Sequence, residues 1–185
     1  MAGIKRKPEK IRRPTIKQFR DLVGSVTSLK DRAFICFLYL TGARISEIVK
    51  QIRRYQIEFT QIEGKKFIMV HNVITLKRRK EIYRDIPIPV NDFEEAFLNP
   101  LIDYLNTIPS DQFIFNFSRS RGWKIVKDKT YLFPHYFRHL RLTHLVTEYN
   151  FSERDLTFFT GWADGRQATT YTHLNLRDLA RKFTK

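Results

Sequence analysis

Hydrophobic and polar residues at the start of the chain follow a helical spacing in three consecutive segments. Residues 15–26 begin with Thr and have Gln three positions later, which is the pattern of a helix capping box. Residues 28–40 begin with a similar Ser-x-x-Asp signal and continue as an apolar run that Thr41-Gly42 ends. A third amphipathic segment starts near Arg44. We therefore predict three helices, the second of them in the core.

Between residues 55 and 89 the spacing changes to that of extended chain. Residues 55–59, 67–70 and 82–87 are short runs rich in aromatic and β-branched side chains. Polar residues at 64–66 and 77–80 separate these runs and supply the turns. This arrangement predicts a small antiparallel sheet.

The remainder of the chain returns to a helical pattern. Helices are predicted over residues 92–104 and 135–149, and two more begin at Ser152 and Asn175. The fold class is therefore α+β: a mostly helical domain with a small antiparallel sheet inserted after the first helices.

Length and charge narrow the possible functions. The chain has 185 residues and a mass of 22.2 kDa, which corresponds to one domain, placed here at residues 14–185 after a basic arm or linker at residues 1–13. Lys and Arg number 34 against 19 Asp and Glu, so the net charge is +15, an excess typical of proteins that bind a polyanion. Hydrophobic residues make up 42% of the chain, too many for a disordered basic tail. A folded domain that binds nucleic acid is expected.

Cysteine usage and hydropathy exclude several classes. The only cysteine, Cys36, lies in an apolar run, so an internal disulfide, a zinc finger and an iron–sulfur cluster are excluded, and a buried, inert thiol is expected. No segment has the length and hydropathy of a membrane span, and the N-terminus lacks the apolar core of a signal peptide. We expect no membrane partner and a cytoplasmic or nucleoid-associated location.

No motif for a small-molecule cofactor is present. The chain contains no phosphate-binding loop, no dinucleotide-binding glycine motif, and no zinc-protease or serine-hydrolase motif. His135 and His139 have a spacing that places both on one helical face, but no carboxylate or thiol is positioned to complete a metal site. No cofactor and no metal are therefore expected.

Three short segments carry side chains suited to holding a phosphate. Arg44 follows the helix-ending Gly42 and starts a new helix, where a guanidinium and free backbone N–H groups can face one anion. His135 and Arg138 are three positions apart on one helical face. Tyr171 lies in a polar segment that offers little reason for its packing. On the same helix as His135, the residues predicted to be buried are Phe133, Phe137 and Leu140.

In order and spacing, these segments resemble the catalytic domain of the tyrosine recombinases, of the lambda-integrase and XerC/XerD type. The resemblance rests on the segments TGARISEI, PHYFRH and GWADGRQATTYTHL and covers roughly residues 14–183. It implies a prokaryotic or viral DNA recombinase or integrase. The catalytic residues that it implies are Arg44, Lys77, His135, Arg138, Trp162 and Tyr171, the last as nucleophile. The lysine belongs to a hairpin turn that is longer or differently registered here, so Lys80 is an alternative to Lys77.

The chemistry of these side chains agrees with that resemblance. A free tyrosine phenol has a pKa of about 10, so attack on a phosphodiester at neutral pH requires nearby positive charge. Arg44 and Arg138 can stabilise both the phenolate and the phosphoryl group, while His135 donates a hydrogen bond or transfers a proton and Lys77 protonates the departing 5′-oxygen. The resulting 3′-phosphotyrosyl bond conserves the phosphodiester energy, so religation needs neither ATP nor a divalent metal.

Some residues in these segments have two interpretations. Glu47 either forms an ion pair with a neighbouring base that orients a helix, or supports the site from behind Arg44. Trp162 either packs its ring, donates its indole N–H, or does both. Several basic residues, individually ordinary surface charges, are expected as a set to line the DNA backbone: Arg53, Arg54, Arg78, Arg79 and Lys124.

The resemblance also implies partners. Members of this family act on double-stranded DNA as tetramers and carry a helical core-binding domain ahead of the catalytic one, for which this chain has no room, so an isolated catalytic domain or a fragment is expected. A type IB topoisomerase-like nicking and closing enzyme and a non-catalytic DNA-binding relative are the alternatives. One sequence does not reveal the target DNA sequence or whether Tyr171 is delivered in cis or in trans. It also does not distinguish integration from excision or chromosome resolution.

Overall fold

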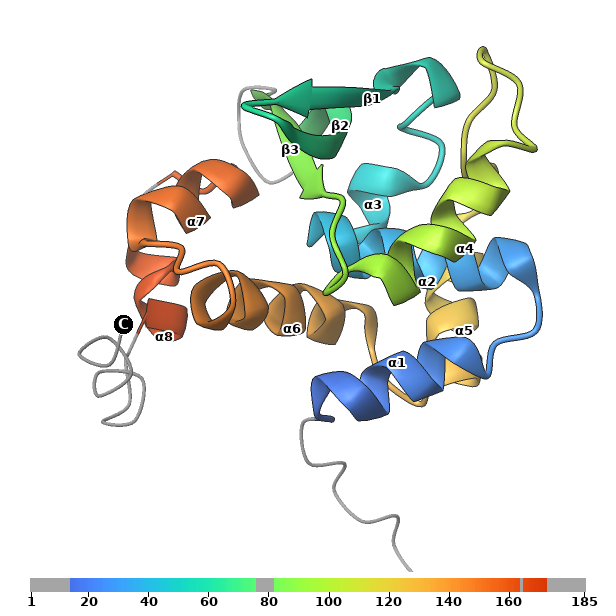
Figure 1. The fold of residues 1–185 in the computed structure, drawn as a ribbon. Coiled ribbons are helices and arrows are strands. Elements are labelled where there is room, and N and C mark those ends of the chain that lie inside the picture. Colours follow the sequence, from blue (N-terminus) through green and yellow to red (C-terminus); the bar gives the residue numbers. More distant parts are fainter. Residues whose placement is uncertain (1–13, 76–81, 164, 173–185) are drawn as a thin grey trace, which may run out of the picture.

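The computed structural model describes residues 14–75, 82–163 and 165–172, in which helices surround a central apolar helix and a small sheet lies at one end (Figure 1). The first part runs α1 (Ile16–Gly24), α2 (Leu29–Thr41), α3 (Ile45–Ile48), the 3₁₀ turn η1 (Arg54–Gln56), β1 (Ile57–Ile62), β2 (Lys65–Thr75) and β3 (Ile82–Pro89). The second part runs α4 (Glu95–Leu105), α5 (Arg119–Thr130), α6 (Pro134–Thr147), α7 (Glu153–Thr160), the 3₁₀ turn η2 (Gly165–Gln167) and α8 (Thr169–Thr172). The predicted α+β class is confirmed.

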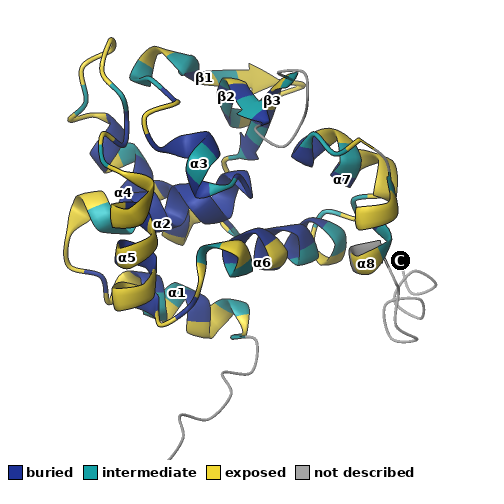
Figure 2. Cartoon of the chain, turned by 180° about the vertical axis from the view of Figure 1, so that it is seen from behind, coloured by how far each residue is buried: buried dark blue, intermediate teal, exposed yellow. Residues whose placement is uncertain are grey.

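Helix α2 forms the centre of the core, as its apolar sequence predicted. Its last nine residues, from Ala33 to Thr41, are all buried, and the helix is dark along most of its length in Figure 2. Ser28 Oγ accepts from the Asp31 N–H at 3.3 Å at the start, and Gly42 ends the helix in the left-handed region (φ 56°). Gly42 therefore ends α2 at a fixed residue, and the chain turns there toward α3.

Helix α1 closes the core from one side. The predicted capping box is present: the Gln18 N–H donates to Thr15 Oγ1 at 3.2 Å and the Thr15 N–H donates to Gln18 Oε1 at 2.9 Å. Phe19 then enters an aromatic cluster whose ring centroids lie 5.1 to 5.4 Å from its own. The partners are Tyr39 of α2, Phe97 of α4 and Phe137 of α6. This cluster joins four helices.

The three strands form one antiparallel sheet in the order β1-β2-β3. A bulge between Val70 and Val73 shifts the register of β2, and Asn72 adopts a positive φ of 55° there. Strand β3 is an edge strand, which suits Pro87 because proline has no N–H to donate to a ladder. The inward face of the sheet is apolar and rests on the helices: Ile68, Val70, Val73, Ile86 and Ile88 are buried.

Helix α5 was not predicted. Its sequence, RSRGWKIVKDKT, has basic residues scattered along it and contains Gly122, so it has weak helical periodicity. A Cβ at Gly122 would lie 3.0 Å from the Phe34 ring and 3.2 Å from Ile45, so the missing side chain lets the helix approach the core closely. Ser118, whose Oγ accepts from the Arg121 N–H at 3.2 Å, was the one local sign of a helix start.

Two smaller expectations also changed. Phe133 was expected on the buried face of its helix, but it is the extended residue before Pro134 and its side chain is 53% exposed. Phe137 and Leu140 are buried as predicted. The helix predicted from Asn175 lies outside the described residues. None of the helices described here is long and apolar enough to span a lipid bilayer.

Candidate active site

The turn after α2 places Arg44 at the start of α3. Arg44 is the extended N-cap residue of that helix, two positions after the left-handed Gly42. Its backbone N–H donates to Glu47 Oε2 at 3.0 Å, and its Nη1 donates to Glu47 Oε1 at 2.7 Å. The Arg44 side chain keeps 21% of its surface exposed, so an anion from solvent has access to the guanidinium.

Glu47 is a fully buried carboxylate that two arginines share. Besides its contacts with Arg44, it accepts from Arg84 Nη2 of strand β3 at 3.2 Å. Burial alone raises the pKa of the Glu47 carboxyl, but the Arg84 charge and the hydrogen bonds from Arg44 outweigh burial and lower the pKa below its usual value. The expected ion pair of Glu47 with a neighbouring basic residue is therefore confirmed, and its partners are Arg44 and Arg84.

Arg84 was missed at the sequence level. It is 8% exposed, and its Nη1 also donates to Thr75 Oγ1 at 2.6 Å across the sheet. Alternation along β3 could have found it, because period-two spacing places Arg84 on the same inward face as Ile86 and Ile88. A charged residue at an inward position of an otherwise apolar face indicates a buried partner.

Arg138 of α6 joins the site from another direction. It is 2% exposed, and its Nη1 donates to the Gly42 carbonyl oxygen at 2.9 Å, two residues before Arg44. Its guanidinium carbon lies 5.4 Å from the centre of the Trp162 ring, within the range of a cation–π contact. The structure thus brings Arg138 and Trp162 together at the turn that carries Arg44.

Trp162 follows the C-cap of α7. Gly161 is left-handed (φ 66°), and the Trp162 N–H donates to the Thr157 carbonyl oxygen at 3.1 Å, which closes the end of the helix. The Trp162 side chain is partly buried against the core. The predicted packing of its ring is therefore confirmed, and a donor role for its indole N–H stays a prediction.

His135 and Tyr171 lie on helices that pack against each other. His135 is exposed on the first turn of α6, with its ring centroid 4.7 Å from that of His139. Tyr171 belongs to α8, which contacts α6 and η2. Both proposed lysines, Lys77 and Lys80, lie outside the described residues, in the segment that connects β2 to β3.

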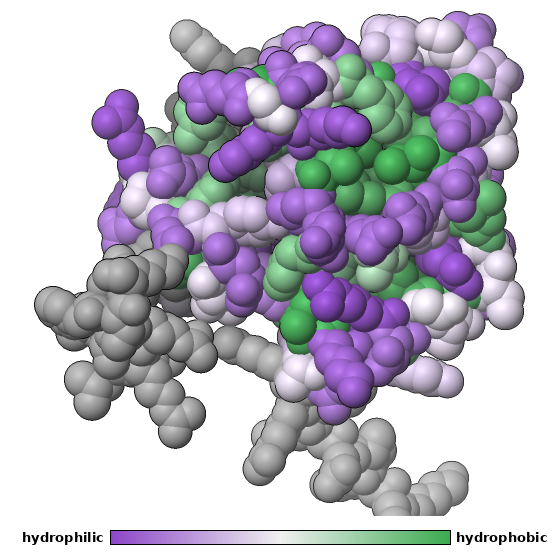
Figure 3. Space-filling view, viewed as in Figure 1, coloured by the Kyte–Doolittle hydropathy of each residue, from purple (hydrophilic) through white to green (hydrophobic). Residues whose placement is uncertain are grey.

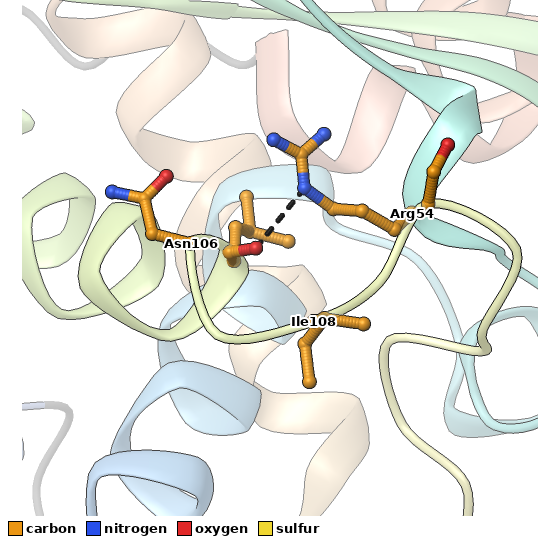
Figure 4. Close-up of a pocket in the computed structure, with 5 residues that line it drawn as sticks. Arg54, Asn106 and Ile108 are labelled. Carbon is orange, nitrogen blue, oxygen red and sulfur yellow. Dashed lines mark hydrogen bonds between the residues drawn. The ribbon is translucent and has the colours of Figure 1, made fainter.

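The basic residues expected along the DNA backbone differ in their surroundings. Arg54 Nε donates to the Leu105 carbonyl oxygen at 3.1 Å beside a shallow hollow near the end of α4 (Figure 4), and Arg53 bonds the Asp111 carbonyl oxygen. Lys124 is exposed on α5. The face of the molecule in Figure 3 carries hydrophilic side chains around smaller hydrophobic areas. Arg78 and Arg79 lie outside the described residues.

The described side chains offer no evident metal site. Within residues 14–75, 82–163 and 165–172, no group of three or more His, Cys, Asp or Glu is arranged to hold a metal ion. The charged groups gathered around the Gly42 turn are cationic apart from Glu47. Such a site attracts an anion, and a phosphodiester has two non-bridging oxygens that share one negative charge and accept hydrogen bonds.

A helical domain with an inserted three-stranded sheet and this arginine-rich turn has the fold of a tyrosine recombinase catalytic domain. The model of the phage integrase family matches residues 12–177. The chain therefore belongs to the phage integrase family. A comparison with curated protein sequences found no match.

Solved structures that share this fold include two recombinases and a transposon integrase. A crystal structure of XerA recombinase superposes with a TM-score of 0.64 and 18% identity over 99% of this chain and 66% of that one. XerH site-specific recombinase bound to difH substrate, in a pre-cleavage complex, superposes with a TM-score of 0.61 and 17% identity. That match covers 91% of this chain and 51% of the XerH chain. The Tn1549 transposon integrase in complex with circular intermediate DNA superposes with a TM-score of 0.56 and 16% identity. That match covers 93% of this chain and 64% of the integrase chain. The chain thus spans between half and two thirds of these solved chains.

Proposed function

We propose that this chain is the catalytic domain of a site-specific DNA recombinase or integrase that cuts and rejoins duplex DNA through Tyr171. The observation that carries the proposal is the meeting of two arginines at one turn: Arg138 donates to the Gly42 carbonyl oxygen at 2.9 Å, and Arg44 follows two residues later. Two guanidinium groups beside one point can hold the non-bridging oxygens of a phosphodiester. Family membership and the DNA complexes of XerH and the Tn1549 integrase support duplex DNA as the substrate.

In the proposed reaction, the Tyr171 phenolate oxygen forms a bond to phosphorus while the bond from phosphorus to the 5′-oxygen breaks. Arg44 and Arg138 stabilise the negative charge that grows on the phosphoryl oxygens. His135, exposed at the start of α6, serves in proton transfer, and Lys77, with Lys80 as the alternative, protonates the departing 5′-oxygen. The product is a 3′-phosphotyrosyl bond.

The second half of the reaction reverses the first with a different strand. The 5′-hydroxyl of a second DNA strand attacks the phosphotyrosyl phosphorus, and the Tyr171 oxygen leaves. Because one phosphodiester is exchanged for another through a covalent intermediate, the proposed cycle consumes neither ATP nor a divalent metal. Exchange between two duplexes requires four copies of the domain, so the proposal includes assembly of a homotetramer on DNA.

The test is capture of the covalent intermediate. A library of nicked duplexes of randomised sequence is incubated with the protein, where loss of a short 5′-hydroxyl strand at the nick traps cleaved DNA. The products are then separated under denaturing conditions. The wild-type protein is expected to give an adduct that survives denaturation, and proteolysis followed by mass spectrometry is expected to place the nucleotide on Tyr171.

Two substitutions serve as controls. Tyr171→Phe removes the nucleophilic oxygen and is expected to abolish the adduct, while Tyr55→Phe, at an exposed tyrosine in η1, is expected to leave it unchanged. Absence of an adduct with the wild-type protein, or an undiminished adduct with Tyr171→Phe, would refute the proposal. Relaxation of supercoiled plasmid without sequence preference and without strand exchange would identify a topoisomerase-like enzyme instead.

A further inference from the structure

Arg84 lies where three parts of the site meet. Its Nη2 donates to Glu47 Oε2 of α3, and its Nη1 donates to Thr75 Oγ1 at the end of β2. A Cβ at Gly161, the C-cap of α7, would lie 2.8 Å from Thr75 Oγ1 and 3.3 Å from Arg84 Cδ. The Arg84 side chain is therefore packed against α3, the base of the β2–β3 hairpin and the turn that leads to Trp162.

Sharing Glu47 changes the charge that Arg44 presents. With Arg44 alone, the buried carboxylate would form a neutral pair and compete with an incoming phosphate for the guanidinium. With Arg84 as a second cation, the three groups carry a net charge of about +1, because guanidinium groups stay protonated at neutral pH. Since Arg44 is the partly exposed member and Arg84 is buried, the surplus charge faces the solvent side.

Sharing also orients the carboxylate. Glu47 Oε2 accepts from the Arg44 backbone N–H at 3.0 Å and from Arg84 at 3.2 Å, which leaves Oε1 to the Arg44 guanidinium at 2.7 Å. Loss of Arg84 would leave the Arg44 backbone N–H as the one partner described here for this oxygen, which could then rotate toward the Arg44 side chain. The guanidinium would then be drawn back toward Glu47 and away from the position where it meets an anion.

The same contact ties Arg44 to the hairpin. Thr75 pairs with Ile82, next to the segment that contains Lys77, and Arg84 lies two residues after Ile82 on the same strand. The Arg84 guanidinium bonds both Thr75 and Glu47, and it thereby fixes the position of the base of this hairpin relative to Arg44.

We infer that Arg84 is a positioning residue for DNA cleavage, which by sharing Glu47 keeps Arg44 cationic and aligned toward the scissile phosphate. This inference rests on the proposed function. Arg84 acts through its neighbours, since its side chain is buried and bonded to Glu47 and Thr75.

The experiment compares single-turnover adduct formation on the best nicked duplex from the library. Arg84→Met, which removes the charge, is expected to slow adduct formation by about 10- to 100-fold, by analogy with the loss found when a residue that orients a metal ligand is removed. DNA binding is expected to change less than about threefold, because backbone contacts over the whole duplex determine affinity. Arg84→Lys, which keeps the charge, is expected to retain most of the rate. Arg20→Met, at a partly buried arginine that bonds the Phe93 carbonyl oxygen, is the matched control and is expected to react as wild type.

The double variant Glu47→Gln, Arg84→Met separates charge from packing. It removes both buried charges and leaves Arg44 cationic, so it is expected to react at least about fivefold faster than Arg84→Met alone, although one more native contact is gone. If Arg84→Met does not fold, the test instead compares the rate of adduct formation of the double variant with that of wild type. A rate within about tenfold of wild type supports the inference, and a larger loss overturns it.

Each remaining outcome decides between the two proposals. If the wild-type protein forms no adduct, the proposed function fails and this inference fails with it. If wild type reacts and Arg84→Met reacts equally fast, the proposed function stands and the inference is wrong. If Arg84→Met is slow and the double variant is no faster, Arg84 acts through packing alone and the inference is overturned.

Discussion

A buried ion pair between α4 and α6 allows a quantitative prediction of stability. Glu94 and Arg141 both have fully buried side chains and form a salt bridge through Oε1 and Nη1. The Tyr149 hydroxyl donates to the same Glu94 oxygen at 2.8 Å, and the Arg141 guanidinium lies over the Tyr39 ring. The pair is not part of the proposed chemistry, but Arg141 also packs against Gly42, the turn that Arg138 bonds.

Glu94→Gln keeps the shape of the side chain and removes its charge. Arg141 would then be a buried cation without a compensating anion, which costs about 3–5 kcal/mol of unfolding free energy. For a domain of this size the melting temperature is expected to fall by roughly 10 °C. The double variant Glu94→Gln, Arg141→Met removes both charges and is expected to recover about half of the loss or more, since apolar replacement of a buried pair is often nearly neutral.

Urea unfolding monitored by circular dichroism measures both effects. Glu95→Gln, at the exposed neighbouring position, is the control and is expected to change the unfolding free energy by less than about 0.5 kcal/mol. A loss below about 1 kcal/mol for Glu94→Gln would show that Arg141 is well solvated without its partner. If the loss in the double variant equals the sum of the losses in Glu94→Gln and in the single variant Arg141→Met, the two charges are not coupled.

Two further predictions concern pH and backbone conformation. Burial, and then the charges of Arg141 and Arg20, lower the pKa of His144 to about 4, so between this value and about 6.5 the unfolded chain binds a proton that the native state does not. The contribution of neutral His144 to the free energy of unfolding is therefore expected to be fully present above about pH 6.5 and to decrease as the pH falls toward about 4. Urea unfolding of a His144→Gln variant should show a smaller loss of unfolding free energy between about pH 7 and pH 5 than wild type. An equal loss in the two proteins would contradict this. Gly161→Ala combines a positive φ of 66° with a Cβ 2.8 Å from Thr75 Oγ1 and is expected to cost at least about 1 kcal/mol. Gly24→Ala has open space around it and is expected to be neutral or stabilising, and equal melting temperatures for the two variants would refute the strain argument.

Local features of the fold could be predicted because their causes lie within a few residues. The capping box of Thr15 and Gln18 and the end of α2 at Gly42 both depend on contacts within about one helical turn. The sheet followed from alternation, although the bulge at Asn72 carried β2 further than the pattern indicated. Helix α5 was missed because Gly122 weakens its helical pattern. The reason for a glycine at this position is the close approach to side chains of α2 and α3, which the sequence does not show.

The candidate site divides in the same way. The segments that carry Arg44, His135, Arg138, Trp162 and Tyr171 could be recognised in the chain by their resemblance to the tyrosine recombinases. Their arrangement could not, because the contact of Arg138 with the Gly42 carbonyl joins residues 96 positions apart. Spacing along one helix says which side chains share a face, but not what lies opposite that face.

The sequence by itself therefore determined the candidate residues for chemistry, through the resemblance of their segments to the tyrosine recombinases, and the helices α2 and α6, through local periodicity. Tertiary structure alone decided how the buried charges are balanced. Arg84 is 37 residues from Glu47, and Arg141 is 47 residues from Glu94. The energy of a buried charge depends on what surrounds it in three dimensions, and no local pattern in the chain records a partner that the fold supplies.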